Sequence, residues 1–177
     1  KLLHSVTHYK GTLTWLPNFA YNFLEQKTRE RMLEGVDLSS WRAVINCSEP
    51  VRPESHRAFL EKFAPYGLGR HALQTCYAMA ENVFAVTQSH LAGGPRVEEV
   101  DRGAFMTERI ARDPRKGRPS MKIMSSGRPI SNTRVRVLDT EGKPVAERII
   151  GEIALHSDCM LTGYYNRPDE TEKAFRE

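Results

Sequence analysis

The apolar residues in the first half of the chain recur at spacings that predict alternating strands and helices. We expect a strand over Thr12 to Leu16, and Pro17 opens a helical stretch. A second strand is expected over Trp41 to Cys47, because three consecutive apolar residues within it are typical of a strand that is buried on both faces of a parallel sheet.

The pattern then repeats, with a second helix and a third strand. Pro53 suits a first helical turn, and the residues that follow place apolar or neutral side chains on one helical face: His56, Phe59, Leu60 and Phe63. The third strand is expected over Leu73 to Tyr77. This alternation implies right-handed crossovers and a parallel sheet, whose ligand sites lie beyond the carboxyl ends of the strands.

The second half of the chain has a different pattern. Positions 93–125 are polar, interrupted by glycine and proline, and are predicted to form a long loop excursion. Two alternating segments, Thr133 to Asp139 and Ile149 to Leu155, predict antiparallel strands. Pro168, followed by two acids, opens a final helix.

These elements predict an α/β fold in which a parallel βαβ sheet segment is followed by a smaller antiparallel β-rich part. The division is 1–92 for the βαβ part, 93–125 for the excursion, and 126–177 for the β-rich subdomain and the start of a helix. With 177 residues, of which 40% are hydrophobic, the chain is large enough to bury a substantial core.

Composition narrows the class of partner. The formal charge is +4, and no run of basic residues is interleaved with aromatic residues, so nucleic-acid binding is not expected. The basic cluster from Arg109 to Arg118 fits either a solvated loop or a docking surface for an acidic partner.

The cysteines and the hydropathy indicate the setting. Cys47, Cys76 and Cys159 lack metal-ligand spacing and are odd in number, which favours a reducing, cytoplasmic environment over a disulfide framework. No apolar stretch approaches the roughly 20 residues that a membrane span needs, so none is expected.

The candidate binding residues follow the second and third predicted strands. They are Asn46, Cys47, Ser48 and Glu49 after the second strand, and Tyr77, Ala78, Met79, Ala80 and Glu81 after the third. An aromatic ring at such an edge can stack on a purine, and a carboxylate can hold Mg²⁺ against phosphate oxygens. Taken alone, the segment after the second strand is explained equally well by an ordinary strand-to-helix turn. The segment after the third strand is, taken alone, better explained by a core tyrosine and a surface acid.

Together with a later segment, they carry a resemblance to a known family. Gly151-Glu152-Ile153, Gly163-Tyr164 and the stretch from Arg167 to Thr171 resemble a conserved block of the adenylate-forming superfamily, and Tyr77 to Glu81 resembles its tyrosine-glycine-x-threonine-glutamate motif. The sequence of these motifs is most similar to that of the fatty acyl-AMP ligases. These have a proline-asparagine-phenylalanine-alanine-tyrosine stretch, here Pro17 to Tyr21.

The resemblance implies roles for the candidate residues. Tyr77 would lie against the adenine, and the loop from Asn46 to Glu49 would approach the adenine and the acyl group. Glu81 would bind Mg²⁺ and act in catalysis. Cys47 and Ala78 stand where the family usually has glycine, and a Cβ at these positions could narrow the nucleotide crevice.

The resemblance also implies an activity for the longer protein of which this chain would be an internal piece. That activity is ATP-dependent activation of a fatty acid as an acyl-adenylate, with transfer to a carrier-protein thiol. The alternatives are an acyl-CoA synthetase, with coenzyme A as acceptor, or a non-catalytic nucleotide-binding or structural module. The family's phosphate-binding loop, ribose-binding aspartate and C-terminal lysine are not found between Lys1 and Glu177, so we expect the isolated chain to be inactive.

Overall fold

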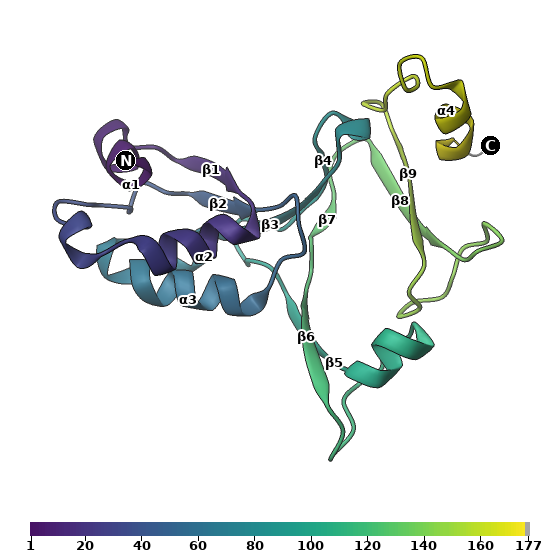
Figure 1. Ribbon diagram of the computed structural model, residues 1–177, viewed down its shortest axis with the longest axis horizontal. Helices are drawn as coiled ribbons and strands as arrows, with labels where there is room; N and C mark the ends of the chain where they lie inside the picture. The colour runs from purple at the N-terminus through teal and green to yellow at the C-terminus, as the bar shows by residue number, and fades with distance from the viewer. Residues whose placement is uncertain (176–177) are drawn as a thin grey trace.

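A five-stranded sheet forms the centre of the structure, a computed structural model that describes residues 1–175 (Figure 1). Its strand order is β1-β2-β3-β4-β7. The strands are β1 (Leu13–Leu16), β2 (Ala43–Asn46), β3 (Leu73–Ala78), β4 (Ala85–Gln88) and β7 (Arg128–Pro129). The first three are parallel, as the sequence predicts, whereas β4 and β7 pair antiparallel and make the sheet mixed.

Three helices precede or connect the parallel strands. They are α1 (Leu2–Tyr9), α2 (Asn18–Lys27) and α3 (Pro53–Phe63), and a fourth, α4 (Pro168–Ala174), closes the described chain. Single 3-10 turns lie at Glu30–Met32, Ala64–Tyr66, Arg70–Ala72 and Ala80–Asn82. The predicted helix starts are confirmed: α2 begins directly after Pro17, and α3 and α4 each begin with a proline in the first turn.

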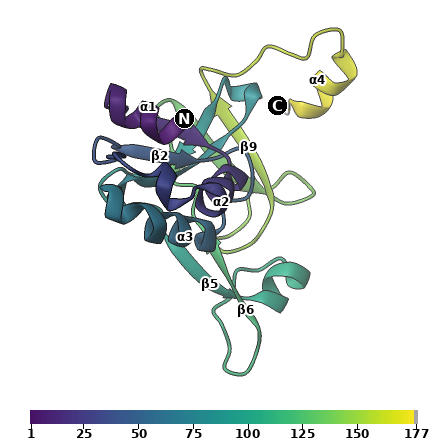
Figure 2. The same cartoon turned by 60° about the vertical axis from the view of Figure 1, so that its left-hand side comes forward.

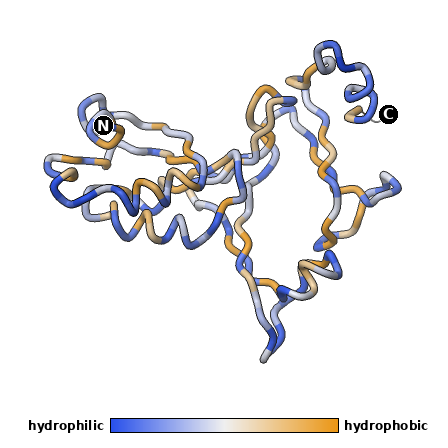
Figure 3. Tube along the Cα trace, viewed as in Figure 1, coloured by the Kyte–Doolittle hydropathy of each residue, from blue (hydrophilic) through white to orange (hydrophobic). Residues whose placement is uncertain are grey.

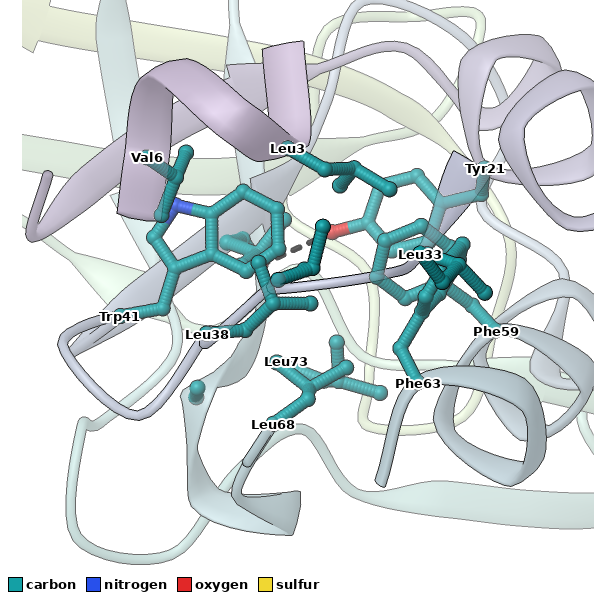
Figure 4. Close-up of a cluster of buried hydrophobic side chains, with 13 residues drawn as sticks. Leu3, Val6, Tyr21, Leu33, Leu38, Trp41, Phe59, Phe63, Leu68 and Leu73 are labelled. Carbon is teal, nitrogen blue, oxygen red and sulfur yellow. Dashed lines mark hydrogen bonds between the residues drawn. The ribbon is translucent and has the colours of Figure 1, made fainter. Parts of the chain in front are cut away.

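The main core lies between the helices and one face of the sheet (Figure 4). Trp41, Tyr21, Phe59 and Phe63 are at most 2% exposed and pack with Val44 of β2. Burying a large apolar side chain stabilises a fold by about 1.5–3 kcal/mol relative to leaving it exposed. This cluster therefore fixes how α2 and α3 lie against β2.

The opposite face of β2 is also buried. Ala43, Ile45 and Cys47 pack with Cys76 of β3, so β2 is covered on both sides. This confirms that the predicted strand is buried on both faces, although it spans Ala43–Asn46 and not the whole of Trp41 to Cys47.

The outer face of α2 has a different character. Phe19 and Phe23 share one face of the helix, but they are 65% and 58% exposed, whereas Asn18 and Tyr21 are buried. The hydropathy of the trace shows the same alternation of apolar and polar positions along this helix (Figure 3). Helical periodicity alone did not indicate which face points inward.

The predicted loop excursion at 93–125 contains regular structure that the sequence did not predict. Strands β5 (Val97–Asp101) and β6 (Ser120–Met124) pair antiparallel, with a π-helical turn over Ala104–Glu108 between them. Together they form an arm that extends away from the five-stranded sheet in two views (Figures 1 and 2). Val100 opposite Met121 supplies the apolar contact that a two-stranded ladder needs.

The last part of the chain is an antiparallel pair, as predicted. Strand β8 (Thr133–Leu138) pairs with β9 (Glu152–Ser157), which starts three residues later than the sequence pattern indicated. Gly151 precedes β9, where a Cβ would lie 2.2 Å from the carbonyl oxygen of Leu138. No helix in residues 1–175 has the length and apolarity needed to cross a membrane.

Candidate active site

The loop after β2 is anchored through asparagine side chains. Asn46, the last residue of the strand, is fully buried, and its Nδ2 donates a hydrogen bond to Oδ1 of Asn18 at 3.1 Å. The same Asn18 oxygen accepts the backbone N–H of Arg52, also at 3.1 Å. The loop between Asn46 and Arg52 is therefore tied at both ends to the start of α2.

Two further residues of this loop have defined positions. Ser48 is exposed and has a φ of 69°, a left-handed conformation that is uncommon for residues other than glycine. Glu49 accepts the backbone N–H of Phe19 at 2.5 Å, and this caps the first turn of α2. Glu49 thus already carries a structural hydrogen bond, which sequence spacing did not indicate.

Cys47 and Cys76 lie side by side on neighbouring strands. Asn46 is paired with Thr75 in the parallel register, so the two cysteines are the next residues along β2 and β3. Both are 3% exposed and belong to one cluster. Burial, and secondarily the neighbouring Cys47, raises the pKa of Cys76 to about 11, so its thiol is a protonated packing group at neutral pH.

The segment after β3 turns sharply into β4. Tyr77 and Ala78 are half-buried, and the Tyr77 hydroxyl lies 3.8 Å from Sδ of Met79, a weak contact. The N–H of Met79 donates to the carbonyl of Phe84, which closes the turn, and Ala80 is exposed within it. The turn places Glu81 beyond the carboxyl end of the parallel strands.

Glu81 contacts a segment that lies far along the chain. Its Oε1 accepts the Tyr164 hydroxyl at 2.7 Å, and its carbonyl accepts the N–H of Leu161 at 2.8 Å. The hydrogen bond from Tyr164 is the main cause that holds the pKa of Glu81 below its ordinary value. Conversely, the bond to Glu81 raises the pKa of Tyr164, so the pair is a carboxylate and a neutral phenol.

A cavity of about 400 Å³ opens beside this pair. Met79, Glu81 and Tyr164 line it, together with residues of β9, of the turn at 160–161 and of the chain end. The β9 residues were not predicted as site residues. The one sequence signal for them was the resemblance of the segment that contains Gly151, Glu152, Gly163 and Tyr164 to a family block.

The structure therefore places the candidate residues at one edge of the sheet, but their side chains bond to different parts of the chain. The turns after β2 and β3 leave the same side of neighbouring parallel strands, where Cys47 and Cys76 belong to one buried cluster. Glu49 faces α2, whereas Glu81 faces Tyr164. Within residues 1–175, no group of three histidine, cysteine, aspartate or glutamate side chains gathers in a way that could hold a metal ion.

Comparison with known proteins assigns this arrangement to a family. The profile described as AMP-binding enzyme matches residues 1–165. A medium-chain-fatty-acid–[acyl-carrier-protein] ligase of Moorena producens is 32% identical over 98% of the chain, and a long-chain-fatty-acid–AMP ligase of Mycobacterium marinum is 31% identical over 94%. The chain spans 30% and 27% of these two relatives.

Solved structures agree with the sequence relatives. A fatty acyl-adenylate ligase from L. pneumophila, solved in complex with acyl adenylate and pyrophosphate, superposes with a TM-score of 0.92 and 33% identity over 98% of this chain and 30% of its own. Since the family profile covers nearly all of its residues, this chain belongs to the AMP-binding enzyme family.

Proposed function

We propose that the whole protein that carries this chain activates a fatty acid with ATP, forming an acyl-adenylate and releasing pyrophosphate. The observation that carries the proposal is the ionised Glu81 carboxylate at the sheet edge, held at 2.7 Å by Tyr164 beside a cavity of about 400 Å³. Relatives named for fatty-acid ligation, which match over more than nine-tenths of the chain, support the choice of substrate.

Acyl-adenylate formation requires little covalent chemistry from the side chains of the protein. A carboxylate oxygen of the fatty acid attacks the α-phosphorus of ATP, the bond from phosphorus to the bridging oxygen breaks, and pyrophosphate leaves. Rate acceleration then depends on positioning and on neutralising the negative charge that builds up on the phosphates. This chain would supply the adenine side and one metal ligand of such a site.

The residues present fit a magnesium ion and a nucleotide. Glu81 offers an ionised oxygen ligand, and Mg²⁺ takes most of its remaining ligands from phosphates and water rather than from a protein cage. When bound, the ion would neutralise phosphate charge. Tyr77 would provide the aromatic face for the adenine.

ATP–pyrophosphate exchange that depends on fatty acid, measured on the whole protein, tests the proposal. We expect exchange with the wild type and a loss of at least about a hundredfold in Glu81→Gln, because a neutral amide is a poor Mg²⁺ ligand. The control is Glu61→Gln, which changes an exposed glutamate on α3 paired with Arg57. Absence of exchange in the wild type would refute the proposed function. Equal loss in both variants would refute the role of Glu81.

For the acceptor, we propose the thiol of a carrier protein. The relative from Moorena producens, matched over 98% of the chain, is named for an acyl carrier protein. The second candidate is coenzyme A, since a relative named as a putative fatty-acid–CoA ligase is 31% identical over 92% of the chain. Thioester formation with each acceptor, compared at equal thiol concentration, distinguishes them.

A further inference from the structure

The positive charge of the chain is concentrated in one short loop. Positions 109–118, here called the basic loop, contain five of the 26 lysine and arginine residues and one of the 22 aspartate and glutamate residues. The rest of the chain therefore has 21 of each. The whole formal charge of +4 therefore resides in these ten residues.

The basic loop lies on the arm formed by β5 and β6. It connects the π-helical turn to β6, and every residue from Asp113 to Ser120 is exposed. The arm extends away from the five-stranded sheet, and its tip is strongly hydrophilic (Figures 1, 2 and 3). The charges are thus presented outward rather than packed against the molecule.

The base of the loop is held in place. Oδ1 of the buried Asp101 accepts the N–H of Ala104 at 2.8 Å, and this fixes the start of the π-helical turn. The N–H of Ala111 donates to the carbonyl of Arg148, and Ile110 bridges to Ile149. A fixed base lowers the entropy that a partner must remove when it binds the tip.

Only part of the charge of the loop is neutralised internally. Arg112 pairs with Glu108 at 2.8 Å. Asp113, the single acid of the loop, pairs with Arg148, also at 2.8 Å. Three cations at the tip, Arg115, Lys116 and Arg118, have no ion pair within 4.0 Å in the part of the chain that the structure describes.

The chemistry of the tip favours a protein partner. The basic loop contains no aromatic residue, so it lacks the stacking faces that single-stranded nucleic acids use. A small phosphorylated ligand needs donors that converge in a concave site, whereas these cations stand on a protruding, exposed loop. Separated, unpaired cations of this kind match an acidic protein surface and act mainly by steering association.

We propose that the basic loop docks the acidic surface of the carrier protein that accepts the acyl group. This inference rests on the proposed function and adds the place of contact. Because the charges would act on encounter and not on the reacting atoms, the loop contributes to carrier recognition and leaves adenylation unchanged.

The test compares two triple variants of the whole protein. In the first, Arg115, Lys116 and Arg118 are changed to Ala. The matched control changes Lys27, Arg29 and Arg31 to Ala, which removes the same charge from exposed positions at the end of α2 and beyond it. The readouts are exchange without carrier, acylation of a phosphopantetheinylated acyl carrier protein, and direct binding of that carrier by fluorescence anisotropy.

We expect kcat/KM for the carrier to fall about tenfold in the loop variant at low salt, with a corresponding weakening of binding, and with exchange unchanged. The difference should shrink at high salt, because exposed charges are screened. Equal carrier kinetics and binding in the two variants would overturn the proposal. So would an equal loss with free coenzyme A, a loss of exchange, or binding of a single-stranded oligonucleotide that is tighter than carrier binding. A wild type that binds the carrier but shows no exchange would contradict the proposed function and not the docking surface.

Discussion

Replacing Tyr21 by Phe removes one oxygen atom from the centre of the core. Tyr21 is 0% exposed, and its hydroxyl donates a hydrogen bond to the carbonyl of Val44 at 2.8 Å (Figure 4). Burial raises the pKa of this phenol far above its ordinary value, so the hydroxyl is a neutral donor at neutral pH. The ring stacks on His56 at 5.0 Å, and Phe preserves that contact.

The expected cost follows from what the substitution leaves behind. The ring volume is kept, so no cavity larger than one hydroxyl forms, and the loss is confined to the hydrogen bond. An unsatisfied buried partner costs about 1–3 kcal/mol. A carbonyl oxygen has two acceptor sites, so the Val44 oxygen can retain a second bond, and we expect about 1–2 kcal/mol.

Urea denaturation of the chain measures this directly. Tyr21→Phe should lower the denaturation midpoint without changing the m-value, which indicates a change in stability alone. The control is Tyr9→Phe, the same chemical change at a residue that is 77% exposed, where we expect an effect within about 0.5 kcal/mol. If the two variants are equally stable, the buried hydrogen bond from Tyr21 to Val44 does not stabilise the core, and the reasoning is refuted.

Three further predictions concern single residues. Gly127→Ala should lower the melting temperature much more than Gly117→Ala: both glycines have a left-handed φ, but a Cβ at Gly127 would lie 2.0 Å from the backbone of β4, whereas one at Gly117 has nothing within 4 Å. Equal effects would mean that the loss of stability comes from the left-handed backbone conformation and not from the contact of the Cβ with β4. Burial lowers the pKa of His56 from 6.5 to about 4, so on acidification the unfolded state binds a proton before the folded state does. The free energy of unfolding should therefore fall by on the order of 3 kcal/mol as the pH drops from 6.5 to about 4. The variant His56→Leu should lack this dependence. Under the proposed function, Tyr164→Phe should raise the pKa of Glu81 and move the acidic limb of the pH–rate profile for exchange to higher pH, and an unmoved limb would contradict the coupling.

The parallel half of the fold was predictable because its residues are patterned by burial. β2 is buried on both faces, and α3 has Phe59 and Phe63 on its inner face, so hydrophobicity marks both elements. Helix α1 was missed because only Leu3 and Val6 of its eight residues are buried. The strands of the arm were missed because a two-stranded ladder is exposed on most sides, and β5 contains acidic residues at positions where a buried strand would have apolar ones.

The candidate site was predictable only in part. That the turns after β2 and β3 leave one edge follows from parallel topology, which the sequence pattern indicated. The bond between Glu81 and Tyr164 joins residues separated by 83 positions, and no periodicity encodes such a contact. The capping of α2 by Glu49 depends likewise on the path of a loop, so a residue expected beside a ligand was found on a helix end.

The long sequence separation between Glu81 and Tyr164 has a consequence for biosynthesis. Chains emerge from the ribosome from the N-terminus at about 5–20 residues per second, and early segments can fold first. The βαβ layer can therefore assemble while Glu81 still lacks both its side-chain and its main-chain partner. Until the residues around Tyr164 have been translated, Glu81 has neither of these hydrogen bonds. The surroundings that lower its pKa therefore form late in synthesis.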